Sequence, residues 1–208
     1  MTDAPDPPRQ PALVSNPTAV AAVLTVDRAI YAVARRWLAY VNGLIVGWLA
    51  LAVLAPILLA NGFGGWARLA YAINRPFCHQ RDDRSFHLMG EKFACCQRCT
   101  AIYGGLLLVG LLYAAARGRI PSFSWRVFSC LVAPIAVDGL TQLVGLREST
   151  WLLRTVTGGL FGVAVAWLLL PHLAVGFADM RTQLERRFAR LVAQGRTRPL
   201  TGAPPPLA

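Results

Sequence analysis

The sequence predicts an all-α protein, a polytopic membrane helix bundle of about four transmembrane helices with flanking amphipathic helices. Three observations support this prediction. Of the 208 residues, 55% are apolar and only 15% are charged, whereas an ordinary soluble domain averages roughly 25% charged residues. The mean hydropathy is +0.46. The apolar residues also form long uninterrupted runs, which is typical of segments that cross a bilayer.

Four runs are the expected spans. The longest run without a charge has 24 residues, more than the ~20 that a helix needs to cross a bilayer. The third run contains Asp138 and Gln142, and the fourth contains Arg154 near its start. The expected spans are Trp37 to Ala60, Thr100 to Ala116, Val127 to Leu146 and Trp151 to Phe177.

The segments around these runs define the predicted organisation. Residues 1–17 hold five Pro and no apolar core, so we expect a disordered tail that is not a secretory signal. Residues 18–177 form the bundle, and its first stretch, 18–36, has the apolar spacing of a helix at the membrane interface. A basic amphipathic helix is expected over 178–195 and a second disordered tail over 196–208.

Charge placement indicates the environment and the sidedness. The net charge of +11 comes from 20 Arg and one Lys against ten acidic residues, and much of the Arg flanks apolar runs. The expected partner is therefore the lipid bilayer and not nucleic acid. Counted near the span ends, ten Arg lie on the side of the termini and seven Arg or Lys on the other side. This excess predicts a multi-pass protein of the cell membrane with both termini in the cytoplasm.

Most of the Cys and His residues lie in the connection between the first two spans, residues 61–99. Within this connection, residues 66–77 are expected to form a short surface helix. Four of the five Cys and two of the three His lie within 22 residues there. Cys96-x-x-Cys99 has the spacing with which two thiolates bind one tetrahedral zinc ion. Cys78 and either His79 or His87 complete a set of four ligands.

Other interpretations of the cluster stay open at this point. An iron–sulfur cluster, a disulfide or redox pair, or no cofactor at all are alternatives to zinc. Cys95 is the spare thiol, and Cys130, inside the third span, is expected to serve packing. Haem is disfavoured because the C-x-x-C is not followed by His.

Successive spans cross the membrane in opposite directions, and this places the polar residues of the third and fourth spans on the same side as the loop. The second span starts on the Cys side and the third returns to it, so the end of the third span and the start of the fourth lie on the Cys side. Asp138 and Gln142 are four residues apart and hence share one helix face. An ionised Asp in a span costs about 2.5 to 3.5 kcal/mol and needs a partner, for which Arg154 is the expected counter-ion. The predicted polar pocket comprises Asp138, Gln142, Arg147 and Arg154.

Two further patterns suggest a ligand and a packing mode. Four arginines near the clustered Cys and His are expected at the mouth of the polar pocket. They either attract an anionic ligand such as a lipid phosphate headgroup, or anchor the loop to lipid or to the acidic residues of the loop itself. They are Arg75, Arg81, Arg84 and Arg98. The G-x-x-x-G pairs Gly43/Gly47 and Gly158/Gly162 predict close helix contacts in a compact bundle. A homo-oligomer is compatible with the sequence.

Taken together, these motifs resemble the domain of unknown function 2085 family of small prokaryotic integral membrane proteins. The resemblance covers about residues 66 to 165. It implies membrane location and marks Arg84, Ser85 and Arg98 as residues that support the loop, but it implies no reaction. Cys95 and the Asp82-Asp83 pair depart from the pattern. The matching motifs are Cys78-His79-Gln80, Arg84-Ser85-Phe86, Cys96-Gln97-Arg98-Cys99-Thr100, Asp138-Gly139-x-Thr141-Gln142 and Arg147-Glu148-Ser149.

Two functions from different classes follow. The first is a membrane metal-site protein with Cys78, His79, Cys96 and Cys99 as zinc ligands beside the polar pocket. The second is a membrane thiol–disulfide oxidoreductase that uses the Cys96/Cys99 pair, with Cys78 as the exchanging thiol. A structural or assembly factor is a third candidate function. Transport is less favoured, because the half of the spans away from the Cys and His loop is apolar.

Overall fold

A computed structural model describes residues 17–116 and 118–201. Most of both predicted disordered tails therefore lies outside the described residues. The elements follow the order α1 (Pro17–Ala60), α2 (Gly64–Asn74), the short 3-10 helix η2 (Asp82–Arg84), β1 (Ser85–Leu88), β2 (Glu91–Cys96), α3 (Gln97–Ala115), α4 (Trp125–Leu143) and α5 (Trp151–Ala193). The all-α prediction is confirmed, because the strands amount to one small hairpin in the described chain.

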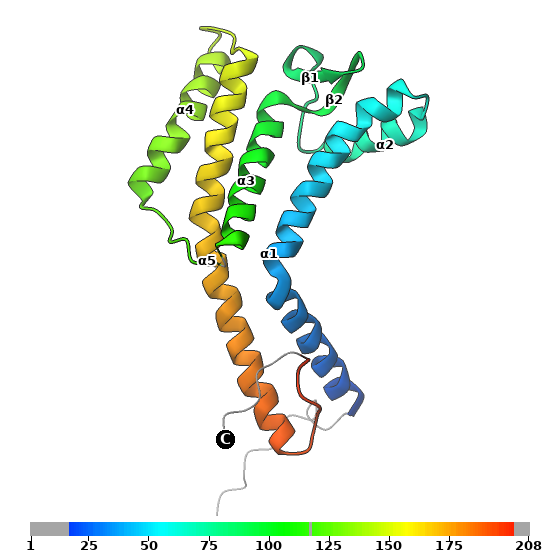
Figure 1. Cartoon of the computed structure of the whole chain (residues 1–208), viewed down its shortest axis with the longest axis vertical. Helices are drawn as coiled ribbons and strands as arrows, with labels where there is room; N and C mark the ends of the chain where they lie inside the picture. Colours follow the sequence, from blue (N-terminus) through cyan, green and yellow to red (C-terminus); the bar gives the residue numbers. More distant parts are fainter. Residues whose placement is uncertain (1–16, 117, 202–208) are drawn as a thin grey trace, which may run out of the picture. The chain divides into compact units, whose positions relative to one another are not determined.

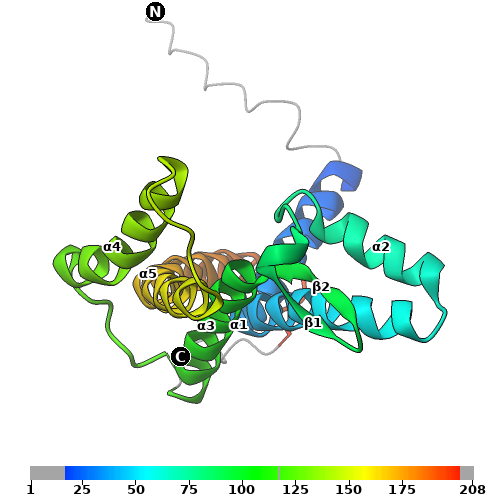
Figure 2. The same ribbon diagram turned by 90° about the horizontal axis from the view of Figure 1, so that it is seen from above.

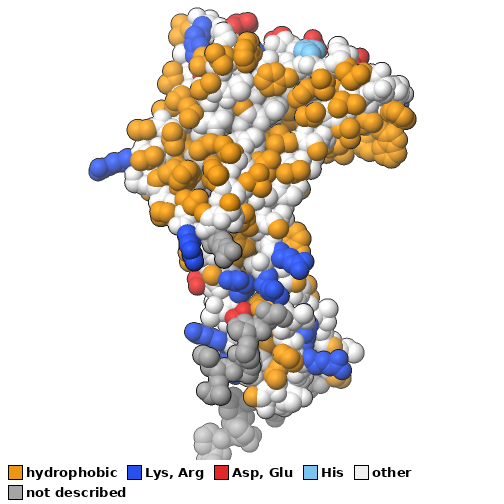
Figure 3. Space-filling model, in the orientation of Figure 1, with side chains coloured by type: hydrophobic (Ala, Val, Ile, Leu, Met, Phe, Trp, Pro, Cys, Tyr) orange, Lys and Arg blue, Asp and Glu red, His pale blue; other side chains and the backbone are white. Residues whose placement is uncertain are grey.

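Four of these helices, α1, α3, α4 and α5, are long and apolar enough to cross a membrane. Each contains or closely matches one expected span. Exposed apolar side chains such as Leu44, Leu108 and Leu140 lie along them, and hydrophobic side chains spread widely over the face drawn in Figure 3. In water this surface would be costly, so it is explained by contact with lipid.

The chain divides into two compact units. The central unit runs from Trp37 to Gly176, and the terminal unit is formed by residues up to Arg36 together with those from Phe177 onward. One boundary falls at Arg36, where α1 has the non-helical angles φ −120° and ψ 15°. The predicted amphipathic stretch 18–36 is thus the helical segment of α1 before this kink, and the predicted helix over 178–195 continues α5 as far as Ala193.

Within the terminal unit the two amphipathic segments pack against each other. Tyr31 and Phe188 are buried in a small apolar cluster with Leu200. Arg187 Nη1 lies 2.6 Å from Asp27 Oδ2, and the Tyr31 hydroxyl lies within hydrogen-bond distance of Glu185, at 2.8 Å. The helix faces that the sequence assigns to the lipid interface therefore bury part of their apolar surface against protein.

Within the central unit, α3 and α5 lie side by side with almost no space between their backbones. A Cβ atom added at Gly158 would lie 2.7 Å from the Arg98 carbonyl oxygen, and one added at Gly105 would lie 2.6 Å from that of Gly159. A Cβ atom added at Gly162 would lie closer still to the carbonyl oxygen of Ile102. The prediction that Gly158 and Gly162 mediate close packing is confirmed.

The other G-x-x-x-G prediction is wrong. A Cβ atom added at Gly43 or Gly47 on α1 would meet no atom within 4 Å, apart from the backbone of its own helix and its chain neighbours. Instead, α1 approaches α3 at Asn42, whose side chain fills the space above Gly110. Gly spacing alone does not determine which helix face is buried, since the contact depends on neighbouring side chains.

The connection between α1 and α3 folds over one end of the central unit. Figures 1 and 2 both show the β1–β2 hairpin between α2 and the start of α3. The expected surface helix is present as α2, but the sequence patterns do not predict the hairpin. It is antiparallel, pairing Ser85 with Cys96 and Leu88 with Glu91. Its turn residues Met89 and Gly90 both have positive φ, at 56° and 83°, as a two-residue type I′ turn requires.

Candidate functional site: a cysteine cluster beside an arginine-lined cavity

The junction of β2 and α3 positions two of the clustered cysteines. Cys96 ends the strand and is the N-cap of α3, with φ −71° and ψ 161°. Cys99 lies in the first turn of the helix, three residues later. Both thiols are therefore at a helix N-terminus, whose partial positive charge favours thiolates.

Cys78 reaches the same place from the segment after α2. Its backbone N–H donates to the Asn74 carbonyl at 3.1 Å, which continues the helical turn. Its sulfur accepts a hydrogen bond from the backbone N–H of Cys96 at 3.1 Å. The sulfur atoms of Cys78, Cys96 and Cys99 all lie within 4.8 Å of one another. Two separate chain segments thus bring three sulfurs to one point.

The surroundings of Cys78 favour its thiolate form. The neighbouring thiols of Cys95, Cys96 and Cys99, together with the Cys96 N–H, hold the pKa of Cys78 well below its ordinary value. The pKa of Cys95 lies above the ordinary value, because the neighbouring Cys78 and burial both disfavour a second negative charge. Cys78 is therefore the thiol of this group that most readily carries negative charge.

Cys95 has a defined partner and is not simply a spare thiol. It is 1% exposed, and its sulfur donates to Asn74 Oδ1 at 3.1 Å. The Asn74 side chain is itself fully buried and donates to the Ala70 carbonyl at 3.0 Å. Sequence reasoning does not select Asn74, because a lone Asn at the end of a surface helix carries no distinctive signal.

The histidines occupy different positions. His79 lines the same cavity as the clustered cysteines, but it is not among the residues whose ligand atoms meet. His87 Nε2 lies 3.3 Å from Asp82 Oδ1 on the exposed side of the hairpin. Cys130 is exposed on α4 and outside the cluster. The structure thus brings three of the four predicted metal ligands into contact distance.

The cysteine cluster opens onto a cavity of about 420 Å³. Its wall combines the thiols with polar residues from the ends of three helices, so Gln142 of α4 and Arg154 of α5 face the same space as the sulfurs. The full lining comprises Phe77, Cys78, His79, Gln80, Arg81, Arg84, Cys96, Arg98, Cys99, Gln142 and Arg154. The volume is in the range of small-molecule sites, roughly 300 to 1,000 Å³.

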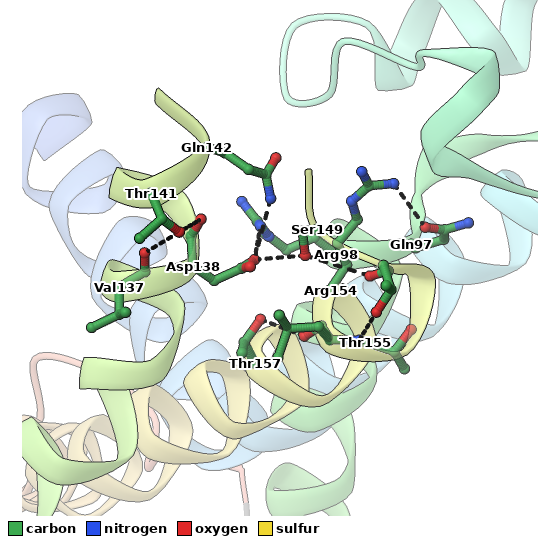
Figure 4. Close-up of polar contacts among 12 residues, drawn as sticks. Gln97, Arg98, Val137, Asp138, Thr141, Gln142, Ser149, Arg154, Thr155 and Thr157 are labelled. Atoms are coloured by element: carbon green, nitrogen blue, oxygen red, sulfur yellow. Dashed lines mark hydrogen bonds and ion pairs between the residues drawn. The ribbon is translucent and has the colours of Figure 1, made fainter. Parts of the chain in front are cut away.

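Next to this cavity, Asp138 forms the centre of a buried polar network, shown in Figure 4. The carboxylate is 1% exposed and forms ion pairs with Arg98 and Arg147, the latter at 3.0 Å. The Ser149 hydroxyl donates to it at 3.0 Å and the Gln142 amide at 3.5 Å. The expectation that Arg154 is the counter-ion is wrong, because Arg98 of the adjacent α3 occupies that position.

Arg154 instead contacts the start of α3. Its Nη1 donates to Gln97 Oε1 at 3.4 Å, and Gln97 Nε2 donates to the Ser85 carbonyl at 3.2 Å. Ser85 is buried, and its hydroxyl donates to the Arg81 carbonyl at 2.8 Å. Gln97, which sequence reasoning does not select, therefore joins Arg154 to the hairpin.

The predicted loop-support residues all make contacts at the site. Ser85 bonds to the Arg81 carbonyl and Arg98 pairs with Asp138, while Arg84 lies 3.5 Å from Asp83 and also lines the cavity.

Two further residues fix the loop. The Gln80 amide donates to the Tyr71 carbonyl at 2.7 Å, and Lys92 Nζ donates to the Gln80 carbonyl at 3.0 Å. Gln80 has a positive φ of 52°, so the chain reverses sharply after His79.

Fold and site together define a class: a multi-pass membrane helix bundle with a cysteine cluster at the end of its helices. Residues 78–168 match the model of the family described as "Predicted membrane protein (DUF2085)". The chain belongs to this family, the domain of unknown function 2085 family, as the motifs indicated. The matched region contains every predicted site residue.

Two archaeal relatives support this membership. An uncharacterized protein of Methanocaldococcus jannaschii is 42% identical over 105 residues, which cover 49% of this chain and 66% of that protein. An uncharacterized protein of Methanothermobacter thermautotrophicus is 37% identical over 101 residues, which cover 48% of this chain and 91% of that protein. No solved structure matches the chain.

Proposed function

We propose that this protein is an integral membrane protein that binds one zinc ion through the thiolates of Cys78, Cys96 and Cys99. The observation that carries the proposal is the position of the three sulfurs, all within 4.8 Å of one another. A tetrahedral zinc with Zn–S bonds of about 2.3 Å places its sulfurs roughly 3.8 Å apart. Only a small inward adjustment therefore separates the three thiols from zinc geometry.

The environment of the sulfurs suits a thiolate–metal site. Cys96 and Cys99 lie at the N-terminus of α3, and Cys78 accepts the Cys96 N–H at 3.1 Å. Such N–H donors and helix termini stabilise the negative sulfurs that a metal needs as ligands. Zinc bound by three thiolates carries one net negative charge, which nearby arginines such as Arg84 and Arg98 balance.

Three thiolates leave one zinc position without a cysteine. That position faces the cavity, where His79 is the protein's own candidate for the fourth ligand. With His79 bound the site is closed and structural, and with water or a ligand bound it is open, as in catalytic zinc sites. The cavity that adjoins the sulfurs favours the open form.

Metal content tests the proposal. The full-length protein is purified in detergent under reducing conditions, and zinc, iron and thiols are quantified. We expect about one zinc per chain, lost in Cys96→Ser and in Cys99→Ser but retained in Cys130→Ser, which removes an exposed thiol outside the cluster. A further variant, His79→Ala, retains zinc if the fourth position is open.

Three outcomes would overturn the zinc assignment. The first is a folded wild-type protein without metal, and the second is loss of zinc in Cys130→Ser equal to that in Cys99→Ser. Iron with inorganic sulfide would indicate an iron–sulfur cluster instead. A metal-free purified protein, together with a Cys96–Cys99 disulfide trapped by alkylation in cells, would indicate the rival function, a membrane thiol–disulfide oxidoreductase.

A further inference from the structure

The cavity beside the cysteine cluster has a strongly one-sided charge. Its lining includes four guanidinium groups and, among the described residues, no carboxylate. The arginines come from different segments: Arg81 and Arg84 from η2 and its flank, Arg98 from α3, and Arg154 from α5. Converging guanidiniums repel one another unless a negative group lies between them.

The environment of Arg154 is the strongest evidence for an anion-binding site. It is only 7% exposed, and no ion pair to it occurs in the part of the chain that the structure describes. Its Nε has no hydrogen-bond partner, and Nη1 makes a single long contact of 3.4 Å with Gln97. A buried charge without a counter-ion is costly, so a ligand that supplies negative charge would relieve this cost.

The neighbouring acids do not line the cavity. Asp83 pairs with Arg81 at 3.1 Å and with Arg84 Nε at 3.5 Å. Asp138 is shared between Arg98 and Arg147. The Nε atom of Arg98 is, like that of Arg154, buried without a hydrogen-bond partner. Unused donor capacity therefore remains on two arginines that line the cavity.

Two helix N-termini add to this field. Arg98 is the second residue of α3, and Arg154 is the fourth residue of α5. The first turn of a helix carries free N–H groups and a partial positive charge, which together favour phosphate. Figure 4 shows the side chains of Arg98 and Arg154 near each other at the starts of these helices.

We infer that this cavity binds a phosphate group, held by Arg84, Arg98 and Arg154. Guanidiniums that approach from several directions suit a tetrahedral dianion, since each can donate two parallel hydrogen bonds. The inference does not depend on the metal. The phosphate belongs either to a soluble compound or to a lipid headgroup.

Binding is measured on the full-length protein in phosphatidylcholine nanodiscs, both zinc-loaded and stripped with a chelator. The soluble arm titrates inorganic phosphate and pyrophosphate by calorimetry at constant ionic strength. The lipid arm compares retention of phosphatidic acid and phosphatidylcholine by native mass spectrometry. The variants are Arg84→Gln and Arg154→Gln, and the control Arg75→Gln removes an exposed arginine outside the cavity.

We expect at least one phosphorylated probe to bind and each cavity variant to weaken its binding at least about tenfold, while Arg75→Gln leaves binding unchanged. The Arg84 side chain is 31% exposed, so Arg84→Gln should fold. This variant therefore tests the inference even if Arg154→Gln does not fold. Which arm responds identifies the source of the phosphate.

The inference is overturned if no phosphorylated probe binds, or if Arg75→Gln weakens binding as much as Arg84→Gln does. Phosphate binding by a folded protein that purifies without metal under reducing conditions would contradict the zinc proposal alone. Zinc binding without phosphate binding would contradict this inference alone.

Discussion

Asp138 connects α4 to the rest of the central unit. It is the buried residue of that helix, and its carboxylate accepts contacts from Arg98 of α3 and from Arg147 and Ser149 of the α4–α5 connection. Apolar side chains such as Leu140 and Leu143 on the same helix are exposed. The attachment of α4 therefore depends more on charge and hydrogen bonds than on apolar packing.

Replacing Asp138 by Asn should destabilise the protein. The change keeps the shape but leaves Arg98 and Arg147 without their negative partner. We expect a loss of about 2 to 3 kcal/mol in the free energy of unfolding, below the upper range for a buried pair because both arginines reach solvent. Thermal unfolding in detergent measures it. Asp179→Asn, an equal charge change at an exposed position of α5, should have almost no effect. Equal losses in both would contradict this role.

Only part of the site could be predicted residue by residue. The i, i+4 spacing of Asp138 and Gln142 places them on one helix face, and span parity brings that face toward the cysteines. The choice of Arg98 over Arg154 as the partner of Asp138 could not be predicted, since both arginines lie within a turn of a helix start. Helix rotation decides between them, and it is determined by contacts such as Gly158 against Arg98. The G-x-x-x-G pattern predicts close packing at Gly158 but not which residue it contacts.

At the scale of elements, the contact between α3 and α5 depends on glycines that let the two backbones touch. Gly162→Ala would place a methyl group against the carbonyl of Ile102. Since a backbone cannot yield as a side chain does, we expect a loss of about 1 to 3 kcal/mol in the free energy of unfolding. Because the proposed zinc ligand Cys99 lies in the first turn of α3, three residues before Ile102, zinc retention in detergent should also fall.

Gly43→Ala and Gly47→Ala are matched controls for that substitution. Both glycines lie in a G-x-x-x-G pair of a spanning helix, yet neither meets an atom within 4 Å outside its own helix. The same measurement should find these variants as stable as the parent protein. Destabilisation by Gly43→Ala comparable to that by Gly162→Ala would contradict the assignment of the close helix contact to α3 and α5.

Elements that a strong physical constraint requires are the easiest to predict from the sequence. A bilayer demands long apolar helices, so the spans are visible in composition alone. The β1–β2 hairpin has no such signal: its strands are short, and Met89 at a positive-φ turn position is an unusual choice. The sequence pattern assigns Cys96 and Cys99 to a loop, whereas the helix begins at Gln97, so the cysteine cluster gains a helix N-terminus that the pattern does not reveal.

For the whole molecule, we propose that the protein crosses the cell membrane four times, with both termini in the cytoplasm and the cysteine cluster near the opposite surface. Four spans are supported by the length and composition of α1, α3, α4 and α5. An even number of crossings returns the chain to its starting side, and the ten-to-seven distribution of basic residues favours the cytoplasm for the termini.

Reporter fusions test this topology. A reporter that is active only in the cytoplasm should be active at either terminus and in the 117–126 connection, and inactive after Leu146. Termini on opposite sides would exclude four spans. Both termini outside the cytoplasm would agree with four spans but contradict the orientation inferred from the basic residues. The cysteines would then lie in the reducing cytoplasm.

The central claim is that three cysteines from two segments share one zinc ion beside a cavity. X-ray absorption spectroscopy at the zinc edge of the purified protein tests it most directly. We predict three sulfur neighbours at about 2.3 Å and one nitrogen or oxygen neighbour at about 2.0 to 2.2 Å, with the same zinc shell in Cys130→Ser. A zinc shell of nitrogen and oxygen alone, or a lower sulfur count in Cys130→Ser, would contradict the account.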